Sequence, residues 1–432
     1  MSLPRYPEYK DSGVAWLGEV PAHWGVRRLK LNLALLTEKA TRRDWPVALE
    51  NIEGWSGRFL PTEGEFEGDG VAFDAGDILF GKLRPYLAKV FLAERAGEAV
   101  GDFHVLRPKQ GMDGRYVQYQ MLSQSFIDAI DGSTFGSKMP RASWETLGHM
   151  PLTVPPAREQ TAITAFLDRE TAKIDALITE QEKLIALLAE KRQATISHAV
   201  IKGLDPNTPM KDSGVPWLGE VPAHWRMLRV KAVSQFTTSG PRGWSERITE
   251  DGSLFIQSGD LNNTLGIDFE AAKRVSVADD AEAARTRLID GDVVVCITGA
   301  KTGNVAVCAQ LREPAYVNQH LCLIRPTEDV LPLFLASTLK SNFGQTQFEL
   351  SQYGLKQGLS LENIRELWIA VPPRHEQTEI IGFLSAETIM LEELKAQSEH
   401  AIALLKERRS ALIAAAVTGK IDVSCQVENI AI

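Results

Sequence analysis

Cysteine is scarce in this sequence: only four cysteines occur among 432 residues. No two of them stand at the C-x-x-C spacing of metal ligands, which argues against a cysteine-based metal site. Cys296, Cys308 and Cys322 lie in apolar stretches that we interpret as strands, where a free cysteine behaves as a small hydrophobic residue. This usage favours a reducing, cytoplasmic location.

Long apolar runs and an excess of positive charge are also missing. No apolar run approaches the roughly 20 residues that a membrane-spanning helix needs, and residues 1–10 are polar, so we expect neither a membrane span nor a secretory signal. The formal net charge is -9, whereas simple DNA-coating proteins are basic because phosphate neutralisation dominates their affinity. A nucleic-acid function therefore requires locally concentrated basic residues or partners that supply positive charge.

Motifs for methyl transfer and nucleotide hydrolysis are absent from the sequence. No Asn-Pro-Pro-aromatic loop for a target amino group occurs, and the Pro-Pro pairs are confined to two VPP turns. Residues 76–82 match the first seven positions of G-x-x-x-x-G-K-[ST], but Leu83 replaces the magnesium-binding hydroxyl. A strand is also expected inside this match, so we interpret it as coincidence. We expect no catalytic residue and no metal site in this chain.

The most prominent feature is an internal duplication. KDSGVAWLGEVPAHW, from Lys10, recurs as KDSGVPWLGEVPAHW, from Lys211. A second pair of markers follows: VPPAREQTAITAFLDRET from Val154 and VPPRHEQTEIIGFLSAET from Val371. The segments between the markers resemble each other little. We interpret the constant parts as a repeated frame and the variable segments as two different specificities; a duplication without functional asymmetry is the alternative.

After each VPP turn the pattern becomes helical. Pro156 and Pro373 suit the end of a strand and the entry of a helix, and Gly203 and Gly419 stand where the helices should end. Apolar residues recur between these limits at the heptad spacing typical of a coiled coil. They are Ile163, Leu167, Ile174, Leu177, Leu184 and Leu188, and then Ile380, Leu384, Leu391, Leu394, Leu405 and Leu412. Helices of about 40 residues would be ~60 Å long, and we predict that they pair antiparallel with each other; the alternative is that each packs on its own domain.

The predicted fold class is α+β: two β-rich mixed α/β domains joined by two long helices in an antiparallel coiled coil, with pseudo-two-fold symmetry. The predicted order is a frame repeat (1–24), a first variable domain (25–153), a long helix (154–204), a second frame repeat (205–225), a second variable domain (226–370), a second long helix (371–420) and a tail (421–432).

Several duplicated polar and aromatic residues are interpreted as structural. The tryptophans belong to the frame, the histidines lack a neighbouring cysteine or paired histidine, and the aspartates fit turns that precede strands. These residues are Trp16, Trp24, Trp217, Trp225, His23, His224, Asp77 and Asp292.

Each variable segment contains an apolar strand candidate followed by a glycine-flanked basic loop. We call residues 81–86 the first basic loop and residues 298–304 the second basic loop. A late loop of similar character follows in each segment, at residues 135–144 and 353–360. Glycine permits close backbone approach to a ligand, Arg and Lys reach phosphates and guanine, and Asn and Gln pair with adenine. Ordinary surface hairpins with solvated charges are the alternative.

On this basis we predict a set of DNA-contact residues. They are Lys82, Arg84, Tyr86, Ser137, Lys138, Arg141, Arg242, Lys301, Asn304, Lys356 and Gln357.

In these motifs the chain resembles the type I restriction-modification specificity subunits. The resemblance rests on the two WLGEVPAHW frames, the GDILFGKLRPYL strand and loop, the VPP-x-x-EQ turns and the long helix after each. The second segment keeps Gly291-Asp292 but lacks the Arg-Pro-Tyr of the first.

The resemblance implies a division of labour among subunits. Each variable segment would be a target-recognition domain for one half of a bipartite DNA site, and the coiled coil would fix the gap between the halves. Two methyltransferase subunits would hold S-adenosylmethionine and methylate adenine, and restriction subunits that use ATP and magnesium join in some complexes. No cofactor is expected on this chain. Two other hypotheses remain: a recognition module of another methyltransferase-nuclease, and a coiled-coil scaffold that does not bind DNA.

Overall fold

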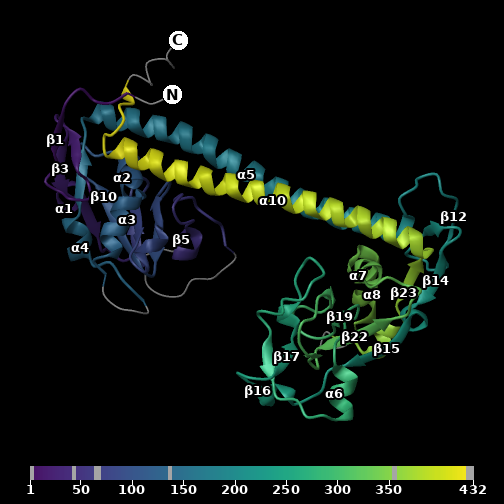
Figure 1. Cartoon of the computed structure of the whole chain (residues 1–432). Coiled ribbons are helices and arrows are strands. Elements are labelled where there is room, and N and C mark those ends of the chain that lie inside the picture. The colour runs from purple at the N-terminus through teal and green to yellow at the C-terminus, as the bar shows by residue number, and fades with distance from the viewer. Residues whose placement is uncertain (1–3, 41–44, 63–69, 135–138, 353–357, 425–432) are drawn as a thin grey trace. The chain divides into compact units, whose positions relative to one another are not determined.

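The structure is a computed structural model, and the chain divides into two compact units (Figure 1). Unit 1 comprises Met1–Glu182 and Glu399–Ile432, and unit 2 comprises Lys183–Ser398. Each unit therefore contains one frame, one variable domain and a segment of each long helix. The structure describes residues 4–40, 45–62, 70–134, 139–352 and 358–424.

The frame of unit 1 forms a β-hairpin beside the first long helix. β1 (Tyr9–Asp11) and β2 (Glu19–Pro21) pair antiparallel. β3 (Gly25–Arg28) pairs antiparallel with β11 (Pro151–Val154), which immediately precedes α5 (Ala157–Lys202). The first and last strands of the variable domain thus lie together at the start of the helix.

Two sheets form the core of the first variable domain. Their strands are β4 (Leu33–Leu36), β5 (Pro46–Val47), β6 (Gly70–Phe73), β7 (Ile78–Gly81), β8 (Val90–Leu92), β9 (Gly97–Val100) and β10 (Phe103–Pro108). The orders are β4-β10-β7-β8 and β5-β9-β6. The helical elements are α1 (Leu29–Asn32), α2 (Gly114–Met121), α3 (Gln124–Asp131), α4 (Trp144–His149), and the 3-10 turns η1 (Leu49–Asn51) and η2 (Pro85–Leu87). Both faces of β7 are buried: Ile78 and Phe80 pack with residues of α2 and α3, and Leu79 packs with residues of the three-stranded sheet. The predicted strand before the first basic loop is confirmed.

Unit 2 repeats this plan. The frame strands β12 (Met210–Asp212) and β13 (Glu220–Pro222) pair, as do β14 (Arg226–Arg229) and β23 (Trp368–Val371). The other strands are β15 (Ser234–Ser239), β16 (Ile248–Thr249), β17 (Ser253–Ile256), β18 (Lys273–Val275), β19 (Val293–Cys296), β20 (Val305–Val307), β21 (Ala315–Val317) and β22 (Leu321–Pro326). They form sheets in the orders β15-β22-β19-β20 and β16-β18-β17-β21. The first of these orders matches the four-stranded sheet of unit 1 strand for strand.

Several helical elements pack around the sheets of unit 2. They are α6 (Ala281–Thr286), α7 (Pro332–Lys340), α8 (Asn342–Ser351) and α9 (Leu361–Arg365), with 3-10 turns η3 (Val230–Val233), η4 (Trp244–Arg247) and η5 (Ser258–Asp260). Val293 and Val295 pack with residues of α7, and Val294 packs towards β17 and β21. Cys296, Cys308 and Cys322 are buried and free, and burial raises the pKa of Cys308 to about 12. Their predicted role as small hydrophobic residues is confirmed.

The two long helices are α5 and α10 (Arg374–Val417), and within each unit their segments lie side by side (Figure 1). In unit 1, Ile163 clusters with Val417, and Asp175 further along α5 pairs with Arg409. From the first contact to the second, the residue numbers increase along α5 and decrease along α10, so the two segments run antiparallel. In unit 2 the Arg192–Glu392 ion pair and the cluster that contains Val200 and Ile380 give the same direction.

The long helices end just before the predicted stop glycines, but the predicted apolar stripe is only partly covered. Gly203 and Gly419, with φ of 74° and 73°, follow the ends of α5 and α10. Leu177, Leu184 and Leu394, predicted to face the partner helix, are 53%, 40% and 41% exposed. The helix pair therefore buries its heptad positions near the variable domains and exposes several near the middle of each helix. No helix among the described residues has the length and apolarity to cross a membrane.

Candidate nucleic-acid interface

A glutamate in the first turn of α5 fixes the frame of unit 1 to the long helix. Glu159 Oε2 accepts a hydrogen bond from Trp24 Nε1 at 2.8 Å, and Glu159 Oε1 lies 2.7 Å from His23 Nε2. Trp24 is fully buried. Its structural role, and that of His23, are as predicted from the frame.

The frame of unit 2 makes the same contacts. Glu376 Oε2 accepts from Trp225 Nε1 at 2.9 Å, and Glu376 Oε1 lies 2.7 Å from His224 Nε2. The other frame tryptophans pack on their own domains, Trp16 against Phe126 and Trp217 against Phe343. The duplicated frame is thus a joint between a β-hairpin and a helix start.

The glutamine that follows each glutamate fixes the variable domain itself. Gln160 Oε1 accepts from the backbone N–H of Asp113 at 2.8 Å, while its Nε2 donates to the carbonyl of Gly111. Gln377 Oε1 accepts from the N–H of Leu331, and its Nε2 donates to the carbonyl of Asp329. Both glutamine side chains are buried, so each Glu-Gln pair joins frame, helix and variable domain in adjacent residues.

A buried aspartate precedes the strand that leads into each basic loop. Asp77, in the turn before β7, accepts from Arg107 Nε and Nη2 at 2.7 Å each and from the N–H of Asp74. Asp292, before β19, accepts from Arg325 Nε and Nη2 at 2.8 Å each. Two-point pairing with arginine fixes the turn, which confirms the structural interpretation of both aspartates.

In unit 1 the first basic loop and the first late loop meet. Leu83 and Arg141 form an isolated antiparallel bridge. The N–H of Ala142 donates to the carbonyl of Lys82 at 2.9 Å, and the N–H of Arg84 donates to that of Pro140 at 2.8 Å. Two stretches that are far apart in sequence thus form one surface, on which Arg84 and Arg141 are exposed.

A single carboxylate lies between the basic side chains of this surface. Asp102 Oδ2 accepts from Arg141 Nη2 at 2.9 Å, and Asp102 Oδ1 lies 3.7 Å from Lys82 Nζ. Tyr86, in η2, is exposed. His104 Nε2 lies 2.9 Å from the carbonyl of Ala142, and burial lowers the pKa of His104. The surface therefore combines exposed basic side chains with one carboxylate that lies between two of them.

In unit 2 the corresponding loops meet in the same way. Thr298 and Gly358 form an isolated bridge, and the N–H of Leu359 donates to the carbonyl of Ile297 at 2.8 Å. Lys301 is exposed and donates from Nζ to the carbonyl of Gly259 at 3.2 Å. The second basic loop therefore presents one exposed basic side chain, that of Lys301.

The remaining predicted contact residues lie in different settings. Asn304 donates to the carbonyl of Leu261 at 3.0 Å and accepts from Lys340 Nζ at 2.8 Å, so both ends of its amide are engaged inside the domain. Arg242 is exposed in the loop before η4. Ser137, Lys138, Lys356 and Gln357 lie outside the described residues. The DNA-contact assignments as a whole stay predictions.

The described residues show no cluster of His, Cys, Asp and Glu suited to a metal ion. The nucleotide-loop-like stretch at residues 76–82 contains the whole of β7, with Ile78–Gly81 extended and buried. A phosphate-binding loop needs free backbone N–H groups between a strand and a helix, and these residues are paired in a sheet instead. The strand predicted inside this match is confirmed.

The comparison with protein families decides where the chain belongs. The model of the type I restriction modification DNA specificity domain matches residues 64–186 and 222–402, which together are more than half of the chain. The chain belongs to this specificity family. Each match includes most or all of one variable domain and part of a long helix, so the family's repeat coincides with the duplication in the sequence.

Curated members of the specificity family are similar over much of the chain. The EcoBI specificity subunit of Escherichia coli is 22% identical over 70% of this chain and 65% of its own length. The EcoDI subunit is 24% identical over 50% of this chain and 47% of its own length. The EcoKI subunit is 22% identical over 75% of this chain and 69% of its own length. The chain thus spans about two thirds or less of the first two relatives.

Solved structures support the same fold. A chain from a study of complex assembly and conformational transition of the type I R-M system has a TM-score of 0.72 at 17% identity, over 92% of this chain and 98% of the other. The HsdS subunit from Thermoanaerobacter tengcongensis has a TM-score of 0.51 at 17% identity, over 93% and 98%. At this identity the likeness establishes the fold of the specificity family alone.

Sequence reasoning missed the residues that join the parts of this specificity protein. Glu159, Gln160, Glu376 and Gln377 were part of the markers, and their duplication was the available signal, but their acceptors and donors lie in distant segments. The ion pairs of Arg192 and Arg409 gave no signal because both arginines stand in charged runs.

Proposed function

We propose that this chain is a sequence-specific DNA-binding subunit in which each variable domain reads one half of a bipartite site. The observation that supports this most directly is the junction of basic loop and late loop, at Leu83–Arg141 in unit 1 and Thr298–Gly358 in unit 2. The junction of unit 1 brings the exposed Arg84 and Arg141 together, and the junction of unit 2 lies in the loop that contains the exposed Lys301. In a chain of net charge -9, such local positive charge suits contact with phosphates and base edges. The sequences of the two junctions differ, which suits two different half-sites.

We propose that the helix pair sets the gap between the half-sites. Half-sites in successive major grooves lie about 34 Å apart, and a helix of 46 residues such as α5 is a stiffer spacer than a flexible linker. Insertion of a few residues at matched positions in both helices should shift the preferred gap and leave the half-site sequences unchanged.

We propose that two methyltransferase subunits dock on the exposed leucines of the helices. Leu177 and Leu394, at corresponding positions of α5 and α10, are 53% and 41% exposed, and Leu187 and Leu404 are 59% and 52% exposed. Exposed apolar residues in matching positions suit two copies of one partner. In this proposal catalysis, S-adenosylmethionine, and ATP with magnesium in a restriction complex belong to the partners.

A gel shift with a methyltransferase partner present, at stated salt, tests the proposal. The preferred site is first found by mapping methylated adenines with and without the gene. Exchange of residues 25–153 for the segment of another family member should then change one half-site only. Absent or sequence-independent binding would favour a protein-binding scaffold, and a change in both halves would contradict the assignment of one domain to one half.

A further inference from the structure

Two arginines occupy the same position in the two copies of the long helix. Counted from the Glu-Gln pair at each helix start, Arg192 of α5 corresponds to Arg409 of α10. The carboxylates that they contact also correspond: Arg409 pairs with Asp175, and Arg192 pairs with Glu392. We call Arg192 and Arg409 the bridging arginines. The duplication has therefore kept an ion pair between the helices in both units.

In unit 1 the bridging arginine also reaches the variable domain. Arg409 Nε donates to Asp175 Oδ1 at 2.9 Å, and Arg409 Nη1 donates to the carbonyl of Trp55 at 2.9 Å. Only 12% of the Arg409 side chain is exposed. Trp55 has a φ of 66°, an uncommon value for a residue with a side chain. One guanidinium thus joins α10, α5 and a loop of the domain.

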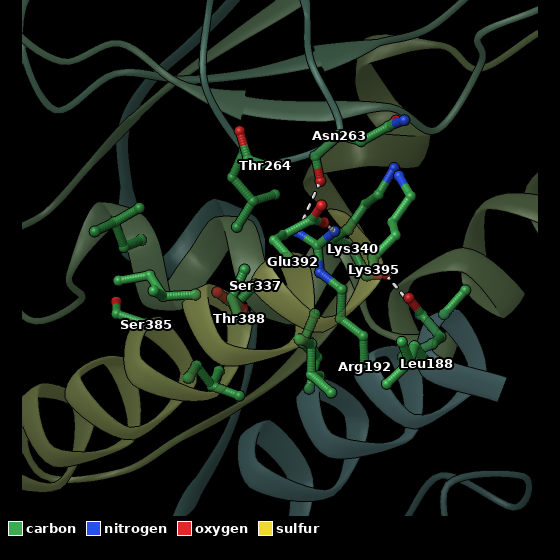
Figure 2. Close-up of a pocket in the computed structure, with 18 of the residues that line it drawn as sticks. Leu188, Arg192, Asn263, Thr264, Ser337, Lys340, Ser385, Thr388, Glu392 and Lys395 are labelled. Carbon is green, nitrogen blue, oxygen red and sulfur yellow. Dashed lines mark hydrogen bonds and ion pairs between the residues drawn. The ribbon is translucent and has the colours of Figure 1, made fainter. Parts of the chain in front are cut away.

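In unit 2 the bridging arginine makes the same three-way contact. Arg192 Nη1 donates to Glu392 Oε1 at 2.8 Å, and Arg192 Nη2 donates to the carbonyl of Asn263 at 3.1 Å. Figure 2 shows the Arg192 side chain extended between Glu392 and Asn263. Leu265, two residues after Asn263, has a φ of 63°. Both acceptors therefore lie in strained loops, which we call the connecting loops: residues 53–58 in unit 1 and residues 262–266 in unit 2.

A cavity lies beside each bridging arginine. In unit 1 a cavity of about 710 Å³ is bounded by the connecting loop, Asp175, Arg409 and further residues of α5 and α10. In unit 2 a cavity of about 450 Å³ is bounded by the connecting loop, Arg192, Glu392 and neighbouring helix residues (Figure 2). Because the loops are separated from the helices there by open space, dispersion contacts hold them less firmly, and the arginine hydrogen bonds span the gap.

The connecting loop of unit 1 is joined to Leu87 and Ala88, the two residues that follow the first basic loop. The N–H of Trp55 donates to the carbonyl of Ala88 at 3.0 Å, just after η2. A Cβ on Gly54 would stand 2.3 Å from the carbonyl oxygen of Leu87, so only glycine permits this approach. Any movement of the connecting loop is therefore transmitted to the end of the segment that contains Arg84 and Tyr86.

The connecting loop of unit 2 is joined to the second basic loop and its neighbouring strand. Asn304 Nδ2 donates to the carbonyl of Leu261 at 3.0 Å, just before this loop, and the N–H of Val307 donates to the carbonyl of Leu265 at 2.8 Å. A continuous set of contacts thus runs from the helix ion pair through the connecting loop, to the residues just after the basic loop in unit 1 and to Asn304 of the basic loop in unit 2.

We propose that Arg409 and Arg192 are positioning residues that fix the basic loop of their own domain relative to the helix pair. The effect on DNA rests on the proposed function; the effect on the loops does not. Each arginine acts on its own unit, and the two arginines serve as matched controls for each other.

Unit 2 contains two further hydrogen bonds between α5 and its variable domain, and the corresponding positions in unit 1 hold other residues. Gln193 Nε2 donates to the carbonyl of Lys340 at 2.9 Å, and Ser197 Oγ accepts from the N–H of Asn342 at 2.9 Å. The corresponding positions of α10 are Ser410 and Ala414, and an alanine side chain makes no hydrogen bond. Loss of the bridging arginine should therefore increase the motion of the variable domain relative to its helices more in unit 1 than in unit 2.

Hydrogen exchange of the full chain tests the loop effect. Arg409→Ala should accelerate exchange in peptides covering residues 53–58 about tenfold, the loss expected for hydrogen bonds to a charged group, and leave residues 262–266 unchanged. Arg192→Ala should show the reverse pattern with a smaller factor. Peptides covering β7 and β19 report whether the variants are folded. Equal changes in both loops, or no change in the variant's own loop, would overturn the inference.

A conservative variant separates positioning from loss of folding. Arg409→Lys keeps the charge but not the planar fork that serves two acceptors, so exchange in residues 53–58 should still accelerate while the Tm stays near that of the wild type. A Lys variant whose loop exchanges like the wild type overturns the need for the two-acceptor geometry.

The DNA consequence is measured in complex with the methyltransferase. The affinity ratio between duplexes whose gaps differ by one base pair should fall about tenfold in Arg409→Ala, in line with the lost hydrogen bonds, while discrimination against half-site mismatches is kept. A wild-type chain that ignores the gap would refute the proposed ruler function, and the exchange data would then decide the present inference. If the wild type prefers one gap length and Arg409→Ala shows the same preference to the same degree, the positioning role is overturned.

Discussion

The end of α10 in unit 1 contacts polar side chains, whereas the end of α5 in unit 2 contacts apolar side chains at the corresponding positions. In unit 1 the carbonyl of Val417, the last residue of α10, accepts from Thr153 Oγ1 at 2.7 Å and from Tyr116 Oη at 3.3 Å. Carbonyls in the last turn of a helix lack partners within the helix, and these hydroxyls satisfy one of them. The site is buried.

In unit 2 the same place is filled by apolar groups. Val200 corresponds to Val417, Phe334 to Tyr116 and Ala370 to Thr153, and these residues of unit 2 belong to one buried cluster. The comparison shows that the frame requires a filled space at the helix end, and either hydrogen bonds or apolar contacts meet this requirement. The two units can therefore diverge in chemistry while their strand order stays the same.

The largest expected difference between the units concerns Asp77 and Asp292, the aspartates that precede β7 and β19. Asp292→Ala should lower the free energy of unfolding by about 3 kcal/mol and Asp77→Ala by about 2 kcal/mol, because each change leaves a partly buried arginine without its two-point partner. Arg107 keeps a second carboxylate, Asp74 at 2.6 Å, whereas the second acceptor of Arg325 is the carbonyl of Arg287. Urea unfolding of the full chain measures both values, and the opposite order would contradict this account.

A smaller difference is expected when the hydroxyl group at the helix end is added in unit 2 or removed in unit 1. Phe334→Tyr introduces a hydroxyl into a fully buried apolar cluster, which should cost about 2 kcal/mol. Tyr116→Phe removes two hydrogen bonds but keeps the packing, and should cost about 1 kcal/mol. Thermal melts of the two single variants test the order. Equal losses would mean that the unit 2 site accepts a polar group, contrary to its lining.

A smaller effect is expected on DNA binding. Arg84→Ala should weaken binding to the first half-site about tenfold, and Lys301→Ala should weaken binding to the second by a similar or smaller factor. Asn304→Ala should lower stability rather than half-site affinity, because its amide is engaged within the domain. Gel shifts with duplexes altered in one half at a time measure the effects, and loss at the wrong half would reassign the loops.

The smallest effect is a pH dependence confined to unit 1. Burial lowers the pKa of His104 below its ordinary value of 6.5, so below that pH the unfolded chain takes up a proton more readily than the folded chain. Stability should therefore fall as the pH drops through 6.5, and His104→Gln should reduce the fall. Cys322 takes the corresponding place on β22, and burial raises the pKa of its thiol, so it stays neutral. Tm values of wild type and variant across this range test the prediction; parallel curves would refute it.

The duplicated sequence markers predicted the architecture because they combine backbone signals. Pro156 and Pro373 restrict the backbone before each helix, glycines end both helices, and the apolar runs at β7 and β19 are buried on both faces. These are local effects of residue type, so they can be recognised without knowing the fold.

The connections between parts were not predictable in the same way. The bridging arginines donate to backbone carbonyls of Trp55 and Asn263, and every residue offers such an acceptor. Nothing in the sequence around these acceptors marks them. The heptad pattern likewise does not distinguish a leucine that faces the other helix from Leu177, which is exposed. Pairing of the loops at Leu83 and Arg141 depends on the β-sheet that places them.

The position of Asp102 has a consequence for selectivity. Because this carboxylate already contacts Arg141 and lies near Lys82, any incoming phosphate must compete with it for the same cations. A ligand that offers only diffuse negative charge gains little from that exchange, whereas one that also satisfies the neighbouring groups gains more. In the proposed DNA-binding function, this carboxylate would act as an internal competitor that disfavours arbitrary polyanions and favours a ligand of matching shape.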